Sequence, residues 1–389
     1  MLSMRRPLAV LGLAAALAAG CTGPGSATDQ PSIRIGLVVA LSGPYRGVGE
    51  DLRDGFELYL STHQGRLGGA TVEVTTLDEA GGGAELAQRI TALTADPRLL
   101  AVTGVTNGET AAALIPLLRG HGVPLVGSNG RPALTDVTGV WHTSFLPTEP
   151  GAAIAAHVRA TVNGPVWAMG ADTQSGHDDV SGFASAFVAA GGRLANESGT
   201  PLWTSQTTNF LPYLAQARAS GAKAIYGHYL GAEAVTFVQQ YAQSDARDLP
   251  LFAAGPLTEG RVLATQGRAA LGIQTVLNYT PDLDNPANRG FVDAWRARHN
   301  TLPTTYAMAS WDAALVLDKA IAAAGELPTP QSVDAALATL GQLDSPRGPW
   351  QFSTRHAPVQ KWYLRRVQTD GRTLTNALIQ DLDTLGATP

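Results

Sequence analysis

The sequence predicts an α/β protein built on parallel sheets, and three observations lead to this fold class. Short apolar runs typical of buried strands alternate along the chain with segments of helical periodicity. This alternation pauses at a polar, Pro-containing segment, residues 141–150, and then starts again, which predicts a second α/β lobe. The composition agrees, because 389 residues suffice for two or three domains, and 44% hydrophobic residues with ordinary charge are typical of a folded chain.

The first lobe is predicted from strands and helices that follow one another in β-α-β-α-β order. Residues 33–41, IRIGLVVAL, form an almost continuous apolar run, as in a central strand buried on both faces. Further strands are expected at residues 70–77, 101–105 and 123–126, and helices at 50–61, 84–94 and 110–118. Pro132 is placed to open another helix. This order predicts a parallel sheet with helices on both faces.

The second lobe is predicted from the renewed alternation after the polar segment. Helices are expected at residues 152–162, 179–190 and 232–242, and strands at 165–169, 224–227, 249–253 and 272–279. Two later helices, 288–299 and 306–324, look like a return to the first lobe. Residues 350–352 and 361–367 are strand-like, and 341–356 is the least predictable connection.

The N-terminus is typical of an exported protein. Arg5 and Arg6 precede an apolar run, residues 8–19, that is shorter than a typical transmembrane helix. LAAGC, residues 17–21, resembles the processing site of bacterial lipoproteins, with Leu17 one place further from the cysteine than usual. Lipidation of Cys21 is therefore expected; ordinary cleavage, leaving Cys21 in a flexible tail, is the alternative. Cys21 is the only cysteine, which excludes a disulfide within the chain.

Composition and motifs argue against several function classes. The net charge of −5 leaves no basic excess for nucleic acid. Neither G-x-S-x-G nor H-E-x-x-H occurs, and the 8 histidines show no metal-ligand spacing, so no enzyme activity, metal or cofactor is expected. Gly47 and Gly49 suggest a dinucleotide loop, but Leu52 stands at the third glycine. The His177-Asp178-Asp179 cluster is explained as a polar helix start.

Two polar turns follow successive predicted strands of the first lobe. They are Asn107-Gly108-Glu109 and Ser128-Asn129-Gly130-Arg131. Ligands of open parallel sheets bind at the carboxyl ends of strands, and free N–H groups at helix starts suit a carboxylate. The turns therefore predict half of a small-molecule site. The alternative is that these residues are merely helix caps and turn formers.

Four stretches resemble a known family. They are IRIGLVVALSGPYRGVGEDLRDGFELYL, GSNGRPALT, DNPANRGFVDAWRARHNTLPTTYAMASWDAALVLDKAI and DSPRGPWQFSTRHAPVQKWYLRRV. The chain resembles the extracytoplasmic solute-binding proteins of ABC transporters, of the leucine/isoleucine/valine-binding type. The resemblance implies the type I periplasmic binding protein fold: two Rossmann-like lobes joined by a three-segment hinge. It also implies that the lobes trap a solute and deliver it to a membrane permease.

The resemblance also gives expected boundaries. Residues 1–21 would be the signal peptide ending at lipidated Cys21, and 22–32 a flexible linker. The N-terminal lobe would comprise 33–146 plus 280–348, and the C-terminal lobe 147–279 plus 349–385. The crossovers are expected near 145–148, 277–279 and 348–352. A lipid-anchored monomer on the outer face of the cell membrane is expected, with a sensor acting on a membrane signalling partner as the alternative.

In this family the two turns hold the ligand's carboxylate. The resemblance therefore assigns the first-lobe contacts to Asn107, Gly108, Glu109, Ser128, Asn129, Gly130 and Arg131, where Gly108 and Gly130 would let backbone N–H groups approach the ligand closely. Tyr45 would line the cleft, or be an exposed loop tyrosine. Arg131 could clamp a carboxylate and Glu109 meet a cation, or the two could neutralise each other; solvated charges at helix starts are the alternative for both.

The second-lobe contacts depart from the family pattern. Ser175 stands where relatives usually carry a tyrosine, whereas Tyr229 matches a ligand-contacting aromatic residue. Leu257 occupies the place where amino-acid binders have an acid for the ammonium group, with Glu259 offset. These departures weaken the case for a standard α-amino acid. The expected ligand is a small carboxylate-bearing solute, either a branched-chain amino acid or a related amide or aromatic compound.

Overall fold

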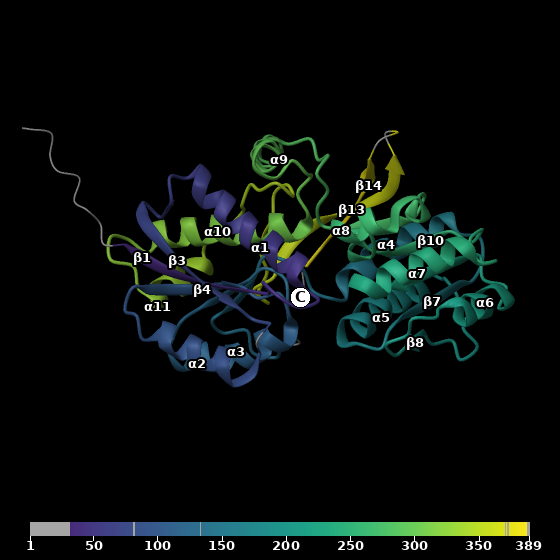
Figure 1. Ribbon diagram of the computed structural model, residues 1–389, viewed down its shortest axis with the longest axis horizontal. Coiled ribbons are helices and arrows are strands. Elements are labelled where there is room, and N and C mark those ends of the chain that lie inside the picture. The colour runs from purple at the N-terminus through teal and green to yellow at the C-terminus, as the bar shows by residue number, and fades with distance from the viewer. Residues whose placement is uncertain (1–31, 81, 133, 370, 372, 387–389) are drawn as a thin grey trace, which may run out of the picture. The chain divides into compact units, whose positions relative to one another are not determined.

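The structure, a computed structural model, describes residues 32–386 except 81, 133, 370 and 372, and confirms the α/β fold class (Figure 1). Its first sheet has the strand order β2-β3-β1-β4-β5-β6, and only β2 runs antiparallel to its neighbour. The strands are β1 (Ile33–Val39), β2 (Arg66–Leu67), β3 (Ala70–Asp78), β4 (Leu99–Gly104), β5 (Leu125–Gly127) and β6 (Val140–His142).

Helices cover both faces of this sheet and complete what we call the first lobe. One face carries α1 (Arg46–Thr62), α10 (Thr305–Ala323) and α11 (Pro330–Leu337), and the other carries α2 (Gly83–Thr94) and α3 (Gly108–Gly120). Val39 packs into the α1/α10 cluster, whereas its neighbour Val38 packs into the α2/α3 cluster. Successive side chains of a strand point to opposite faces, so burial of both faces explains the continuous apolar run.

The second sheet is also parallel at its centre. Its order is β12-β13-β11-β10-β9-β7-β8, and β14 pairs antiparallel with β13. The strands are β7 (Val166–Ala171), β8 (Leu202–Thr204), β9 (Ala224–His228), β10 (Leu251–Ala254), β11 (Gln274–Leu277), β12 (Gln351–Phe352), β13 (Pro358–Thr369) and β14 (Leu374–Leu385). We call this sheet and its covering helices the second lobe.

Each face of the second sheet has its own apolar cluster. One cluster packs against α4 (Glu149–Thr161) and α5 (Gln174–Ala189). The other packs against α6 (Leu211–Ala219), α7 (Gly231–Gln243), the 3-10 turns η1 (Gly255–Thr258) and η2 (Gly267–Ala270), and α8 (Arg261–Gln266). The residue ranges given above for the two lobes stay a prediction.

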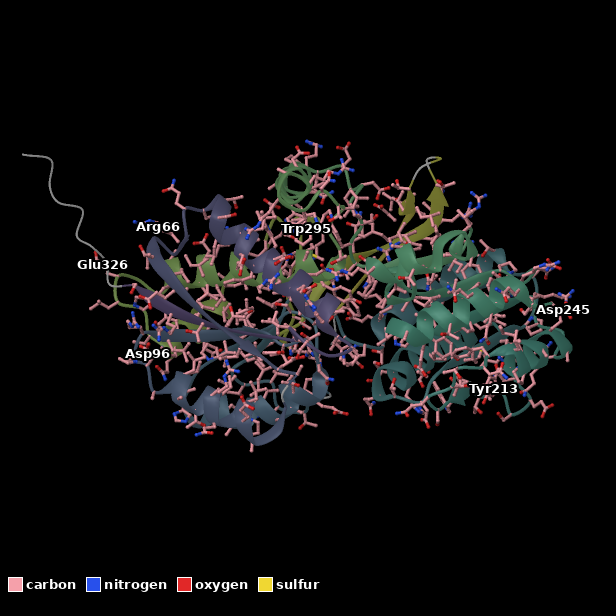
Figure 2. The ribbon with its side chains drawn as sticks, viewed as in Figure 1. Arg66, Asp96, Tyr213, Asp245, Trp295 and Glu326 are labelled. Atoms are coloured by element: carbon pink, nitrogen blue, oxygen red, sulfur yellow. The ribbon has the colours of Figure 1, made fainter. Side chains whose placement is uncertain are left out.

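The chain passes between the two lobes three times: after β6, after β11 and after α11. Helix α9 (Pro286–His299) follows the second passage and carries Trp295, labelled in Figure 2. Trp295 shares an apolar cluster with Leu58 and Met308 of the first lobe and with Tyr279 and Tyr363 of the second-sheet chain. The hinge region therefore has a small core of its own.

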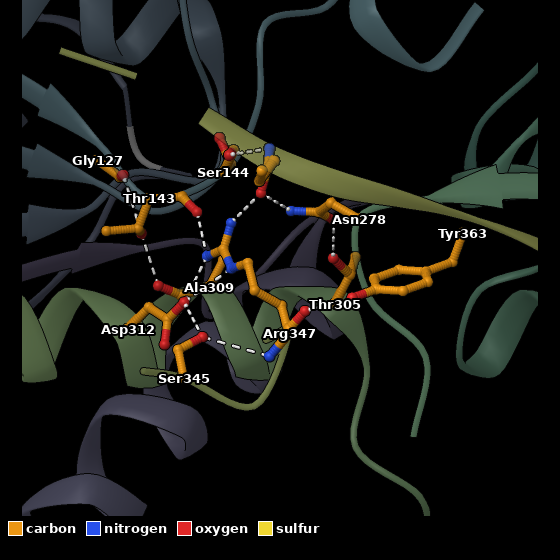
Figure 3. A network of polar contacts seen from close by, with 11 residues as sticks. Gly127, Thr143, Ser144, Asn278, Thr305, Ala309, Asp312, Ser345, Arg347 and Tyr363 are labelled. Carbon is orange, nitrogen blue, oxygen red and sulfur yellow. Dashed lines mark hydrogen bonds and ion pairs between the residues drawn. The ribbon is translucent and has the colours of Figure 1, made fainter. Parts of the chain in front are cut away.

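A buried polar network joins the three passages (Figure 3). The guanidinium of Arg347, 1% exposed, pairs with Asp312 of α10 and donates to the carbonyl of Thr143 and to Gln360 of β13. Asn278, just after β11, also donates to Gln360. Since a buried ion pair requires nearly all its hydrogen bonds to be made, this network fixes the strands where they cross.

Some elements differ from the sequence prediction. The helix expected to open at Pro132 is absent: the described residues between β5 and β6 form turns and extended chain. Tertiary contacts oppose a helix there, because Asn129 donates to the carbonyl of Thr106 and Arg131 to that of Arg355. The sequence also failed to predict β2, β6, β8, α6, α8, α11 and β14.

The predicted signal peptide, most of the predicted linker and Cys21 lie outside the described residues. Within residues 32–386, gaps excepted, no helix is both long and apolar enough to cross a membrane.

Candidate functional site

The two polar turns of the first lobe pack directly against each other. They follow β4 and β5, which are parallel neighbours in the sheet. A Cβ atom on Gly130 would lie 2.3 Å from the carbonyl carbon of Asn107, so only glycine permits this approach. On the other side, a Cβ atom on Gly108 would make an ordinary 3.6 Å contact with the backbone of Arg131. The structure thus brings together the two turns that the sequence singled out.

Several donors of these turns are already used within the chain. The Gly130 N–H donates to the carbonyl of Val105 (2.8 Å), and that of Ser128 to Gly104 (2.7 Å). The N–H of Gly130 is therefore already paired within the chain, and a contact of Gly130 with a ligand stays a prediction. Asn107 caps α3, with its Oδ1 accepting from the Glu109 N–H at 2.8 Å. This agrees with the capping alternative for Asn107.

A carboxylate of the chain itself lies at the start of the first turn. Glu79, 5% exposed, accepts a hydrogen bond from the Thr106 N–H at 3.0 Å. Burial raises the pKa of Glu79 to about 7, although the hydrogen bonds from Thr106 oppose this shift. The turn therefore binds a carboxyl group of the chain itself, whose charged form burial disfavours, and the donor at Thr106 is not free for a solute.

Arg131 provides the cation of the candidate site. Its Nη2 donates to the carbonyl of Arg355 at 2.9 Å, while Nη1 is buried and has no hydrogen-bond partner among the described residues. Burial lowers the pKa of Arg131 to about 10, and the charge of Glu149 opposes this effect. No ion pair links Arg131 to Glu109 in the described part of the chain, and Glu109 is exposed. Mutual neutralisation of these two residues is therefore not observed.

Two residues beside Arg131 were missed by sequence reasoning. Glu149, at the start of α4 and 7% exposed, accepts from the Leu146 N–H; burial raises its pKa to about 7, and the charge of Arg131 opposes the shift. His142 is fully buried, and burial followed by the Arg131 charge lowers its pKa well below the ordinary value. An acid before Pro150 looked like a helix start, and nothing in the sequence indicated that Glu149 lies near Arg131.

The remaining first-lobe candidates differ in exposure. The hydroxyl of Ser128 is buried and, like Nη1 of Arg131, has no partner among the residues described. Tyr45 is 45% exposed at the start of α1, as the exposed-tyrosine alternative expects. The turn after β5 thus carries two buried polar atoms that have no hydrogen-bond partner in the described part of the chain, and such atoms in a folded protein call for a partner.

In the second lobe, Tyr229 and Leu257 face the core. Tyr229 is 0% exposed, with ring centroids 4.9 Å from Phe210 and 4.5 Å from Phe237, and its hydroxyl accepts from Thr204. Leu257 is 1% exposed in the same cluster. Both side chains are packed in the core in this structure, and a contact of either with a solute stays a prediction.

The other predicted second-lobe residues have polar partners. Ser175 lies in the first turn of α5, with its hydroxyl 3.3 Å from that of Thr173. Glu259 accepts from the Thr305 N–H and lies 2.9 Å from Nη1 of Arg365, so it joins α10 to the second sheet. No group of three or more metal-ligating side chains occurs among the residues described.

Comparison with known proteins identifies the family. The periplasmic binding protein family matches residues 32–372, which is most of the chain. The chain belongs to this family. The topology of two lobes joined by three passages agrees with this membership. The resemblance to the leucine/isoleucine/valine-binding type that the sequence indicated is confirmed.

Three similar proteins illustrate the relationship. A "Leu/Ile/Val-binding protein homolog 6" from Brucella suis is 28% identical over 93% of this chain and 94% of the relative. An ABC transporter solute-binding protein from R. palustris, solved with benzoate, is 28% identical with a TM-score of 0.78, covering 92% of this chain and 98% of its own. Another from R. palustris, solved with 4-hydroxybenzoate, is 25% identical with a TM-score of 0.80, covering 91% and 97%.

Proposed function

We propose that this protein is the solute-binding component of an ABC importer and that it binds a small aromatic carboxylate between its lobes for delivery to a membrane permease. Family membership and the two R. palustris proteins solved with benzoate and 4-hydroxybenzoate support this proposal. It requires binding and lobe closure rather than catalysis.

The observation that carries the proposal is the unpaired guanidinium nitrogen of Arg131. Arg131 is partly buried and its Nη1 atom is fully so, and Nη1 has no hydrogen-bond partner among the described residues. A solute carboxylate at Nη1 would supply that partner through a charge-assisted hydrogen bond. Ser128, whose buried hydroxyl is also unpaired, follows β5 in the same turn. Together they suit a carboxylate better than a neutral group.

The second lobe favours a solute without an ammonium group. Leu257, at the position where amino-acid binders place an acid, is apolar and buried, and Glu259 is paired with Arg365. Glu109 is exposed, where an ion pair contributes only about 0–1 kcal/mol. An α-amino acid would therefore bring an ammonium group into the site with little to compensate its desolvation.

Isothermal titration calorimetry of the purified full chain tests the proposal. We expect benzoate to bind and leucine to bind at least about 100-fold more weakly, because one poorly compensated charge costs several kcal/mol. Tighter binding of leucine would refute the aromatic-carboxylate assignment. Binding of neither class would remove the support that Arg131 gives.

A further inference from the structure

His228 is a buried polar residue at the end of the second sheet that faces the hinge. It is the last residue of β9, is 7% exposed, and lies between the parallel strands β7 and β10. The next parallel strand, β11, leads from its carboxyl end directly into the second passage between the lobes. The carboxyl end of β9 is therefore the end where ligands of such sheets bind.

A carboxylate holds the His228 ring in one orientation. Nδ1 lies 3.0 Å from Oδ2 of Asp179, and the same oxygen accepts from the hydroxyl of Tyr226 at 2.8 Å. The other oxygen of Asp179 accepts from the Gly151 N–H in the first turn of α4. Because a carboxylate accepts hydrogen bonds, Nδ1 is the protonated ring nitrogen, which in the neutral imidazole leaves the lone pair on Nε2.

Nε2 has no hydrogen-bond partner within the described chain, although it is buried. Tyr229, the neighbouring residue, points to the opposite face of the sheet and is packed into the core. Of the two neighbours His228 and Tyr229, His228 is therefore the one with a buried polar atom that no described residue satisfies. An oriented imidazole with one free nitrogen accepts an O–H or N–H group with defined direction.

The start of α4 links His228 to the cation of the first lobe. Glu149, in the electrostatic field of Arg131, begins this helix, and Gly151 two residues later contacts the carboxylate that holds His228. The two unpaired atoms, Nη1 of Arg131 and Nε2 of His228, therefore belong to residues on either side of the first passage between the lobes.

We propose that His228 is a specificity-determining residue: on lobe closure its Nε2 accepts a hydrogen bond from a hydroxyl or amino group at the end of the solute opposite the carboxylate. This rests on the proposed function and narrows the solute class to aromatic acids that carry a donor opposite the carboxylate. Asp179 is the positioning residue, since it fixes the tautomer and the ring.

Calorimetry with three probes tests this assignment on the full chain. We expect 4-hydroxybenzoate to bind at least about tenfold more tightly than benzoate, because its hydroxyl would donate to an acceptor that is otherwise unpaired. 4-Methoxybenzoate has no donor at this position and should show no such gain. His228→Leu should bring the ratio for 4-hydroxybenzoate to about one while benzoate still binds. His177→Leu is the matched control, because His177 pairs with Asp172 at the exposed start of α5.

The outcomes separate the two proposals. Failure of the wild type to bind benzoate or 4-hydroxybenzoate would overturn the proposed function, whereas binding of both with equal affinity would overturn only the role of His228. An unchanged ratio in folded His228→Leu would also overturn it. Should that variant not fold, imidazole ¹⁵N spectra of the wild type decide: the His228 Nε2 signal should shift with 4-hydroxybenzoate and not with benzoate, and the absence of this difference would refute the role.

Discussion

The carboxyl ends of the two sheets offer a solute very different surfaces. At the first sheet, Ser128 and Arg131 carry buried polar atoms that no described residue pairs with. At the second sheet the residues expected to meet a solute, Tyr229 and Leu257, lie in the core. Both lobes follow the same parallel topology, so topology alone places the site but does not decide which side chains are presented. The difference supports the proposed division of roles, in which the first lobe recognises the charge of the solute and the second lobe contributes mainly shape and one directed acceptor.

The hinge region between the two lobes is held together by a buried polar network. Arg347 and Asp312 form a buried pair that also contacts Thr143 and Gln360, so the three passages are held at one point (Figure 3). Movement of one lobe against the other is therefore expected in the backbone beyond this network, where a few residues absorb the dihedral changes.

Removing the cation of the first lobe should have the largest effect on binding. Arg131→Met should weaken benzoate binding about 100-fold, since hydrogen bonds to charged groups contribute about 1.5–3 kcal/mol. Calorimetry measures the change. Arg119→Met, which removes an exposed cation of the same lobe paired with Asp136, should leave the affinity unchanged. Equal affinities for Arg131→Met and the wild type would place the carboxylate elsewhere.

Separating the two turns should have the next largest effect. Gly130→Ala puts a Cβ atom 2.3 Å from the backbone of Asn107, and overpacking of this kind costs about 1–3 kcal/mol. We expect a lower melting temperature and roughly tenfold weaker binding. Gly108→Ala, whose Cβ would lie at 3.6 Å, is the matched control and should be tolerated. Similar losses in both variants would contradict the close approach of the turns.

The carboxylate already present in the first lobe should make stability depend on pH. The pKa of Glu79 is raised by burial to about 7, so its contribution to stability is complete below about pH 4.5 and is lost as the pH rises through 7. Glu79→Gln should therefore be more stable than the wild type by about 1–2 kcal/mol at pH 8.

Thermal unfolding of Glu79→Gln and wild type in parallel from pH 4 to 8 measures this difference. Comparison of the two chains cancels the contributions of Glu149 and Asp51, whose pKa values are also raised to about 7 by burial. A stability difference that stays constant over this pH range would contradict the burial of an ionisable Glu79.

The second lobe should respond least in binding. Tyr229→Phe removes only the hydrogen bond from Thr204 at 3.2 Å, so stability should fall by about 1 kcal/mol and benzoate affinity should not change. Chemical denaturation and calorimetry on the same preparation give both values. A clear loss of affinity without a change in stability would return Tyr229 to the site.

Most of the fold could be predicted because its central strands are buried on both faces. The runs at β1, β4 and β7 are apolar over nearly their whole length. In contrast, β14 pairs only with β13, is partly exposed and carries polar residues, so no apolar pattern indicated it. The sequence of α6 likewise has little amphipathic pattern to distinguish it from a loop.

For the candidate site, the sequence indicated where the polar turns lie but not which way the side chains point. Sequence placed the polar turns of the first lobe correctly, because strand ends and glycines are local signals. The orientation of Tyr229 depends on Phe210, which precedes α6, and that helix was not predicted. The pairing of His228 with Asp179 spans 49 residues, and no local pattern reports a contact of that kind.

The most direct test of the account is a crystal structure of the full chain with benzoate. We expect the carboxylate within hydrogen-bonding distance of Nη1 of Arg131, with the ring between the lobes and Tyr229 still packed in the core. A carboxylate bound only at the N–H of Gly108, with Nη1 of Arg131 still unpaired, would contradict the claim that the Arg131 guanidinium recognises the solute.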